Sequence, residues 1–197
     1  MIRNAVKDDV KSISDLHSKC IYTGFLTSLG NKFLELFYCA FIETKSSEIL
    51  VYESDGEIVG FVSCSTNLKD ILKYIILHEL HTLFFAVKHK LLDWKIYRNV
   101  IEDILYFRKT KYRVNSAELV SICARDDMRG NGIGSALVEE MIGKLKKQGV
   151  ESVATLVSDD LQESKGFYEK NGFRLTGKIK LHNNKESSVY TYKIKRQ

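Results

Sequence analysis

The residues with the clearest chemical potential form a glycine-rich turn. The sequence Arg129-Gly130-Asn131-Gly132-Ile133-Gly134-Ser135 follows the apolar segment Leu119–Ala124 and opens a segment with helical periodicity. Glycines at alternate positions leave backbone N–H groups uncovered, and the start of a helix adds unpaired N–H groups with a partial positive charge. The pattern therefore predicts an anion site suited to a pyrophosphate.

Two other phosphate-binding patterns fit this turn poorly. The chain contains no GxxxxGK[ST] sequence, which excludes a P-loop. A dinucleotide-binding fingerprint needs GxGxxG directly after a strand, whereas here the glycines run GxGxG after the polar link Arg125–Met128. On this segment alone, a flexible turn that binds nothing remains an alternative.

The elements that must position the turn are predicted by the hydrophobic pattern. A helix is expected to begin near Asp8 or Asp9, and Phe25–Gly30 is expected to be a loop. Strands are predicted at 2–6, 48–53, 58–65, 119–124, 152–157, 173–181 and 188–194, and further helices at 33–42, 135–148 and 162–171. Asp55-Gly56 predicts a hairpin turn, and Asn183-Asn184 a polar turn between the last two strands. The order predicts a single α/β domain built on one mixed sheet over residues 1–197.

Residues 66–113 differ from the rest and are predicted to be a helical, aromatic insertion between the third and fourth strands. The segment holds ten Lys and Arg and five Asp and Glu, so it carries the whole net charge of +5. A solvated basic face is the favoured interpretation, ahead of an anionic substrate or cofactor and of a nucleic-acid or membrane surface. We expect no nucleic-acid partner. The insertion remains open as a substrate lid, a homodimer interface or a partner-docking surface.

The composition excludes several other classes of protein. The chain is 44% hydrophobic and 28% charged and has no proline, which argues against disorder. Its four cysteines lie far apart without a CxxC pair, so we expect buried thiols rather than a zinc ribbon or a disulfide framework. The sequence His78-Glu79-Leu80-His81 departs from HExxH, and no metal site is predicted. Without an apolar signal or membrane-spanning segment, we expect a soluble cytoplasmic protein.

Two motifs together resemble those of a known family. Arg129-x-x-Gly132-x-Gly134 resembles the [QR]xxGx[GA] motif of the GNAT superfamily, the acyl-CoA-dependent N-acetyltransferases. The sequence Gly166-Phe167-Tyr168-Glu169-Lys170-Asn171-Gly172-Phe173 resembles the family's FYEKxGF signature. The element order also matches over the whole chain apart from the insertion. The resemblance implies the GNAT fold, a mixed, mostly antiparallel sheet flanked by helices, with acetyl-CoA as cosubstrate and no metal.

The resemblance also implies roles for individual residues. The backbone of Ile122, Cys123 and Ala124 would pair with the pantetheine arm, with the thioester carbonyl near the Cys123 and Ala124 amides. The pyrophosphate would be held by the amides of Arg129, Gly130, Asn131, Gly132, Ile133, Gly134 and Ser135. Tyr168 would protonate the departing thiolate, and Glu118 would act as base through water, with Asp159 and Asp160 as the fallback. Tyr22, Phe25 and Leu26 would line the acceptor site.

The sequence also departs from the family pattern at two places. The link Arg125-Asp126-Asp127 lacks the proline that many members carry, and Leu161 stands where many carry an asparagine seven residues before the tyrosine. The cofactor contact that this asparagine makes in other members is therefore not carried over to Leu161.

The expected activity is transfer of an acetyl group from acetyl-CoA to a primary amine by direct attack in a ternary complex. The loop Gly24–Gly30 and the basic insertion resemble acetyltransferases of bacterial amino-sugar synthesis, so a small amine such as an amino-sugar is the first expectation. A protein N-terminal or lysine acetyltransferase, or a non-catalytic acyl-CoA-binding module, are the alternatives.

Overall fold

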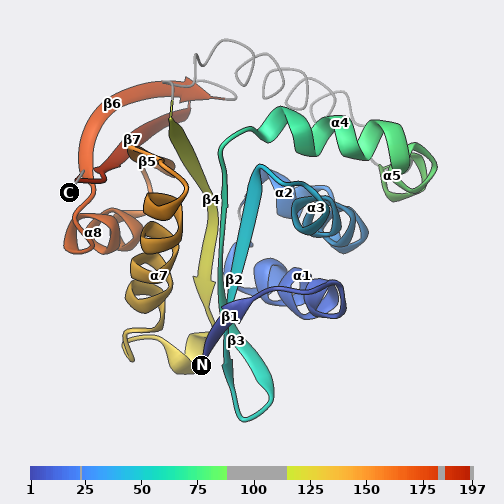
Figure 1. The fold of residues 1–197 in the computed structure, drawn as a ribbon, viewed down its shortest axis with the longest axis horizontal. Helices are drawn as coiled ribbons and strands as arrows, with labels where there is room; N and C mark the ends of the chain where they lie inside the picture. Colours follow the sequence, from blue (N-terminus) through green and yellow to red (C-terminus); the bar gives the residue numbers. More distant parts are fainter. Residues whose placement is uncertain (23, 88–114, 182–184, 196–197) are drawn as a thin grey trace.

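The computed structural model describes residues 1–22, 24–87, 115–181 and 185–195 (Figure 1). The described strands are β1 (Ile2–Asn4), β2 (Ser47–Ser54), β3 (Glu57–Ser65), β4 (Ser116–Ala124), β5 (Ser152–Ser158), β6 (Arg174–Leu181) and β7 (Lys185–Lys193). The described α-helices are α1 (Val10–Cys20), α2 (Phe25–Ser28), α3 (Asn31–Glu43), α4 (Leu68–His78), α5 (Leu80–Val87), α7 (Ile133–Lys147) and α8 (Gln162–Lys170). Two short 3-10 helices, η1 (Lys7–Asp9) and η2 (Asp126–Met128), precede α1 and the glycine turn.

The seven strands form one sheet in the order β1-β2-β3-β4-β5-β7-β6. Neighbouring strands run antiparallel, except that β4 and β5 are parallel. Helices α7 and α8 cover one face, and α1, α3 and α4 cover the other (Figure 1). This arrangement confirms the predicted mixed, mostly antiparallel sheet flanked by helices.

Local sequence explains most element boundaries. Asp55 and Gly56 both have positive φ, at 52° and 76°, which confirms the predicted hairpin turn between β2 and β3. The prediction of a loop at Phe25–Gly30 was wrong in part, because α2 occupies Phe25–Ser28. One turn of helix is too short for apolar periodicity to indicate it, and here the Thr27 hydroxyl fixes it by donating to the Ile21 carbonyl.

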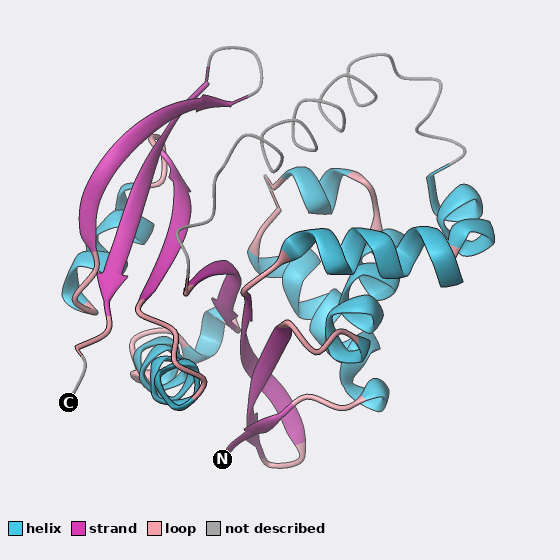
Figure 2. Ribbon diagram, turned by 45° about the horizontal axis from the view of Figure 1, so that its top comes forward, coloured by secondary structure: helices cyan, strands magenta, loops and turns pink. Residues whose placement is uncertain are grey.

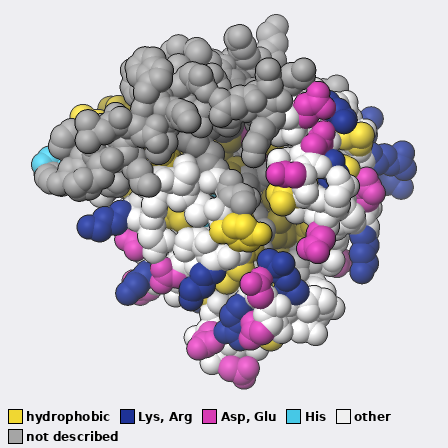
Figure 3. Space-filling view, turned by 180° about the vertical axis from the view of Figure 1, so that it is seen from behind, with side chains coloured by type: hydrophobic (Ala, Val, Ile, Leu, Met, Phe, Trp, Pro, Cys, Tyr) yellow, Lys and Arg dark blue, Asp and Glu magenta, His cyan; other side chains and the backbone are white. Residues whose placement is uncertain are grey.

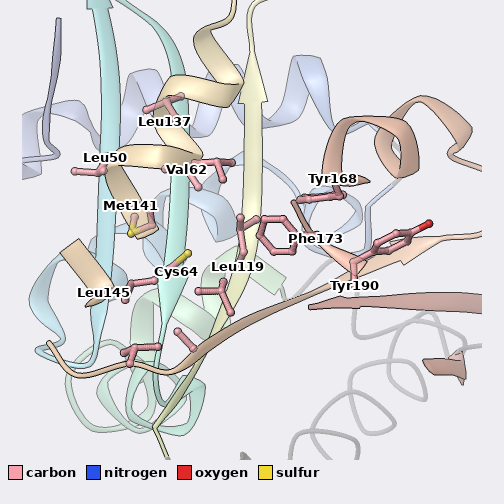
Figure 4. Packing of buried hydrophobic residues seen from close by; sticks show 14 of the residues in the cluster. Leu50, Val62, Cys64, Leu119, Leu137, Met141, Leu145, Tyr168, Phe173 and Tyr190 are labelled. Atoms are coloured by element: carbon pink, nitrogen blue, oxygen red, sulfur yellow. The ribbon is translucent and has the colours of Figure 1, made fainter. Parts of the chain in front are cut away.

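A hydrophobic core lies on the face that α7 and α8 cover (Figure 4). Leu137, Met141 and Leu145 recur every four residues along α7 and are buried against the sheet. They contact Leu50, Val62, Cys64 and Leu119 from the strands, and Tyr168, Phe173 and Tyr190 extend the cluster toward α8 and β7. The core therefore fixes α7, and with it the glycine turn, against the middle of the sheet.

A second core on the opposite face contains one buried polar pair. His17 of α1 is 2% exposed, and its Nδ1 lies 2.5 Å from the Tyr38 hydroxyl, while its ring stacks on Phe61. Among the described residues, no group lies within hydrogen-bonding distance of His17 Nε2. Burial lowers the pKa of His17 from 6.5 to about 4, so the imidazole is neutral in the folded protein.

Because of this burial, we expect acid to destabilise the fold through His17. Between pH 6.5 and 4 the unfolded chain binds a proton that the folded chain does not, so the free energy of unfolding falls as the pH falls. The shift corresponds to a loss of about 3 kcal/mol across this window. Urea unfolding at pH 7.0 and 4.5 measures it. His17→Gln should remove most of the pH dependence of the free energy of unfolding, whereas the control His78→Gln, at an exposed position, should keep it. An equal change in the free energy of unfolding between the two pH values in both variants would contradict the assignment to His17.

The insertion predicted at 66–113 is described only in its first part. Helices α4 and α5 lie between β3 and β4, and residues 88–114 are outside the described residues, as are Asn183 and Asn184. The prediction of a helical, basic and aromatic segment over residues 88–113, which include Lys88, Lys90, Trp94, Lys95 and Arg98, therefore stays a prediction. None of the helices in the described ranges has both the length and the apolarity to span a membrane.

Candidate functional site

Strands β4 and β5 separate in the middle of the sheet. Their parallel pairing runs only from Ser116–Glu118 on β4 to Ser152–Ala154 on β5. Beyond it, β5 continues along β7, and β5, β6 and β7 turn away from the first four strands (Figures 1 and 2). Among the described residues, no strand therefore pairs with the edge of β4 that faces β5 from residue 119 to the end of the strand at Ala124.

The backbone groups at this open edge can be assigned from the pairing with β3. The Arg125 amide donates to the Val59 carbonyl at 2.8 Å. Because N–H and C=O groups alternate between the two edges of a strand, the Cys123 groups also face β3, and those of Ile122 and Ala124 face the open edge. This corrects the prediction for Cys123, whose backbone is turned to β3 and whose thiol faces α1. The predicted binding role of Ile122 and Ala124 stays a prediction.

The glycine turn lies where β4 ends and α7 begins. Gly130 and Gly132 have φ of 82° and 79°, a region that side-chain-bearing residues rarely adopt. Gly132 precedes the first helical residue and offers no side-chain cap, and the Ala136 amide makes the first helical bond, to the Gly132 carbonyl at 2.9 Å. The amides of Ile133, Gly134 and Ser135 come before this first bond, so they have no acceptor within the helix and no side-chain cap. Such a helix start favours an anionic ligand.

Gly134 has a different physical reason to be glycine. A Cβ placed there would lie 3.0 Å and 3.2 Å from two ring carbons of Phe167 on α8. The missing side chain therefore lets α8 pack closely against the first turn of α7. The two sequence motifs, which are separated by about thirty residues, meet at this contact.

Gly60 on β3 supports the turn from below and was missed by the sequence analysis. A Cβ at Gly60 would lie 2.8 Å from Ile133 Cγ2 and 3.2 Å from the Cys123 carbonyl oxygen. The start of α7 therefore rests directly on the β3 backbone. A single glycine inside a predicted strand indicates a bulge, a bend or a close approach, but it does not indicate which segment approaches.

We expect Gly60→Ala to lower the free energy of unfolding by about 1–3 kcal/mol, because the added methyl overpacks this contact. The matched control is Gly143→Ala on the exposed side of α7, where an added Cβ meets nothing within 4 Å. That variant should be more stable than wild type by about 0.5–1 kcal/mol, since glycine weakens a helix interior. Urea unfolding of both variants measures the difference, and a Gly60→Ala protein as stable as wild type would contradict the close packing.

Exposed ion pairs hold the link between β4 and the turn. Arg129 bonds to Asp126 at 2.8 Å, and Arg125 bonds to both Glu57 and Asp127 at 2.7 Å. A cleft of about 690 Å³ lies beside this link, between α1, the β2–β3 turn and residues 125–127. Figure 3 shows hydrophobic side chains in the middle of the rear face, with alternating acidic and basic side chains below them.

Tyr168 of α8 lies buried where the two strands separate. Its hydroxyl reaches Thr155, the first β5 residue beyond the last one paired with β4. Its ring packs edge-on against Phe173 at 5.3 Å and parallel to Tyr190 at 6.3 Å (Figure 4). Burial raises the pKa of Tyr168 to about 12, against a smaller opposing effect of the Thr155 hydroxyl, so the phenol keeps its proton.

Glu118 also lies where β4 and β5 separate, but on the face of the sheet opposite to Tyr168. It is the last β4 residue paired with β5, opposite Ala154. Its neighbours Ala117 and Leu119 belong to the core under α7, so by alternation the half-buried Glu118 side chain points to the opposite face. The two residues predicted to be catalytic thus flank the separation of the strands from opposite faces.

The fallback base Asp159 is occupied by structural contacts. It accepts a hydrogen bond from Ser188 at 2.5 Å and pairs with Lys165 at 3.0 Å and Lys178 at 3.3 Å. The Ser188 hydroxyl and these lysines lower the pKa of Asp159 to about 2, which makes it a poor base. The structure therefore argues against the fallback role of Asp159, which connects β5 to α8, β6 and β7.

The predicted acceptor residues lie in and before α2. Tyr22 is 78% exposed, and Leu26 is half-buried against the core of the α1 face. The side chain of Phe25 is outside the described part of the structure. The acceptor role of Tyr22, Phe25 and Leu26 stays a prediction.

The comparisons with known proteins agree with this geometry. A sequence profile of the acetyltransferase (GNAT) family matches residues 11–173, which include the open β4 edge, the glycine turn and α8. The chain belongs to the GNAT family of acetyltransferases. It is 24% identical over 174 residues to an uncharacterized N-acetyltransferase of Methanocaldococcus jannaschii. The aligned region covers 87% of this chain and 59% of that protein. The chain thus matches little more than half the length of this curated relative.

Solved structures of other proteins share the GNAT fold. Ard1 from Thermoplasma volcanium superposes with a TM-score of 0.64 at 17% identity, over 100% of this chain and 98% of that one. A ribosomal-protein-alanine N-acetyltransferase from Brucella melitensis superposes with a TM-score of 0.65 at 15% identity, over 98% of this chain and 99% of that one. An N-acetyltransferase from Staphylococcus aureus superposes with a TM-score of 0.65 at 17% identity, over 99% of this chain and 98% of that one. At these identities the likeness establishes the fold.

GNAT acetyltransferases use acetyl-CoA as cosubstrate, and two observations on this chain fit that molecule. The open edge of β4 offers amide and carbonyl groups to an extended, amide-containing arm. The uncapped start of α7 offers amides to a diphosphate. Within the described residues, no group of three His, Cys, Asp or Glu side chains could hold a metal ion, and His78 and His81 belong to different helices.

Proposed function

We propose that this GNAT-family protein transfers an acetyl group from acetyl-CoA to a primary amine. One observation carries the proposal: the open edge of β4 is followed, after the short link of residues 125–131, by the uncapped start of α7. An arm that carries amides and ends in a diphosphate satisfies both groups of donors at once. The profile match over the same residues supports this interpretation.

The residues of the open edge would bind and orient the cosubstrate. Ile122 and Ala124 present N–H and C=O groups toward β5, and the amides from Ile133 to Ser135 would hold the diphosphate. Acetyl-CoA supplies the acetyl group as a thioester. An amide of the open edge would stabilise the negative charge that develops on the carbonyl oxygen during attack.

Two side chains would move protons on either side of this edge. Glu118 would accept a proton from the amine through water, which frees the nitrogen lone pair for attack on the carbonyl carbon. Tyr168 would donate its hydroxyl proton to the leaving sulfur as the carbon–sulfur bond breaks. The raised pKa of Tyr168 keeps this proton in place until a thiolate develops.

We propose a small primary amine, with amino-sugars first, as the acceptor. The exposed Tyr22 and the neighbouring α2 would contact it. A protein N-terminus is the second candidate, since the fold is shared with ribosomal-protein-alanine N-acetyltransferases. The two candidates differ in the size of the acceptor, which an assay can separate.

The test is an acceptor screen on the full chain with acetyl-CoA. Released CoA thiol and the acetylated product are measured for amino-sugars, polyamines, and peptides with free N-termini or lysines. Acceptor-dependent CoA release with a matching acetylated product is the expected result. Tight acetyl-CoA binding without turnover of any acceptor would favour a non-catalytic acyl-CoA-binding module, and absence of binding would overturn the proposal.

A further inference from the structure

Two cysteines far apart in the sequence meet at the contact between α1 and β4. Cys20 is the last residue of α1, and its Sγ lies 3.5 Å from the carbonyl oxygen of Ala124 on β4. Cys123 lies one residue earlier on β4, and its Sγ lies 4.0 Å from the carbonyl oxygen of Leu16 on α1. Each sulfur thus reaches across to the element that carries the other, which places the two thiols beside each other at this contact.

The two thiols have different environments. Cys20 is half-buried and lines the cleft beside residues 125–127, whereas Cys123 is buried. The hydrogen bond from Cys123 lowers the pKa of Cys20 to about 7, against burial and the charge of Asp126, and Arg129 adds to the lowering. Burial raises the pKa of Cys123. Cys20 is therefore the accessible thiolate, and Cys123 is the protonated partner beside it.

The other two cysteines provide an internal comparison. Cys39 is half-buried like Cys20, but burial raises its pKa and no thiol lies beside it among the described residues. Cys64 is fully buried, and burial raises its pKa as well. The thiolate is the reactive form of cysteine. Cys20 is therefore expected to be the most reactive of the four cysteines, and Cys123 is the thiol beside it.

We propose that Cys20 and Cys123 form a peroxide-reactive thiol pair, in which Cys20 is oxidised first and Cys123 then closes a disulfide. The Cys20 sulfur attacks one oxygen of hydrogen peroxide, the O–O bond breaks, and the other oxygen leaves as hydroxide and becomes water. The Cys123 sulfur then attacks the sulfenic acid of Cys20, the S–O bond breaks, and hydroxide leaves with the Cys123 proton as a second water. Two thiols thus lose two electrons to one peroxide.

The position of the pair makes the modification relevant to the site. The Ala124 carbonyl, which Cys20 contacts, faces the open edge of β4. A disulfide would draw the Cys20 sulfur away from this carbonyl and join the end of α1 covalently to β4. The oxidation itself does not depend on acetyl transfer, and it can be measured without acetyl-CoA.

Peptide mapping of the reduced full chain tests the proposal. The protein is treated with hydrogen peroxide at pH 7, blocked with N-ethylmaleimide and digested with trypsin without reduction. Cleavage after Lys and Arg places the four cysteines in four separate peptides, which span 20–32, 33–45, 46–69 and 114–125. We expect a linked 20–32/114–125 species that dithiothreitol separates. Cys20 should be consumed at least about tenfold faster than Cys39, as their thiolate fractions differ at this pH.

Two variants separate the roles within the pair. Cys123→Ser should stop at the sulfenic acid of Cys20, which dimedone traps, and Cys20→Ser should leave Cys123 unmodified at the same peroxide dose. Cys39→Ser should leave the linked species unchanged. Absence of the linked species from wild type, or oxidation of Cys39 as fast as that of Cys20, would overturn the proposal. The wild-type mapping decides this even if a variant folds poorly.

Discussion

Gly132→Glu is expected to weaken acetyl-CoA binding by at least about a hundredfold, which corresponds to about 3 kcal/mol. Two effects act in the same direction. Gly132 has φ of 79°, where a residue with a side chain is strained by about 1–2 kcal/mol. The carboxylate would also lie at the uncapped start of α7, where it competes with the diphosphate for the helix amides and repels it. Titration calorimetry with acetyl-CoA measures the loss.

The chain offers a matched control on the same helix. Gly143 lies on the exposed side of α7, and an added Cβ there meets nothing within 4 Å. Gly143→Glu adds the same charge to this helix, about three turns away from Gly132. It should bind acetyl-CoA like wild type. Similar losses in both variants would assign the effect to net charge, and no loss in either would remove the anion site from the glycine turn.

Local chemistry made much of the fold predictable. The hairpin at Asp55-Gly56, the start of α7 after the glycine turn and the end of α8 before Gly172 each depend on residues adjacent in sequence. Glycine at these places allows positive φ, and apolar spacing determines the buried face of α7. Such signals lie within one turn or one strand, so a single sequence contains them.

The features that sequence reasoning missed are contacts between distant segments. Gly60 matters because Ile133 packs on it, Thr155 because the Tyr168 hydroxyl reaches it, and Cys20 because Cys123 lies beside it. None of these residues has a neighbour in sequence that indicates its role. Each is determined only when the strands and helices are assembled.

The correction for Cys123 has a related cause. Sequence alternation tells which residues share a face, but it does not tell which edge of a strand remains open. That depends on the register with β3, where a bulge between Ser63 and Cys64 shifts the pairing, and on the early end of the β4–β5 ladder. Of the three consecutive residues predicted to bind the pantetheine arm, Ile122 and Ala124 are the two whose backbone groups the register turns to the open edge.

Tyr168→Phe is expected to lower kcat about a hundredfold, which is within the usual range for loss of a general acid. The substitution removes only the hydroxyl, and the ring keeps its contacts with Phe173 and Tyr190. The amides assigned to acetyl-CoA lie on β4 and α7, so the affinity for acetyl-CoA should change less than about twofold. Steady-state kinetics with an acceptor identified in the screen, together with calorimetry, separate these two quantities.

Tyr190→Phe is the matched control for Tyr168→Phe. Tyr190 stacks on Tyr168, but its hydroxyl donates to Glu169 at 2.9 Å rather than reaching Thr155. The same atom is removed from the neighbouring ring, so kcat should stay near wild type. Because burial raises the pKa of Tyr168 to about 12, the wild-type rate should show no loss from this residue up to about pH 10. If Tyr168→Phe and Tyr190→Phe both keep full kcat, Tyr168 serves packing alone and the proton must reach the leaving sulfur from another donor.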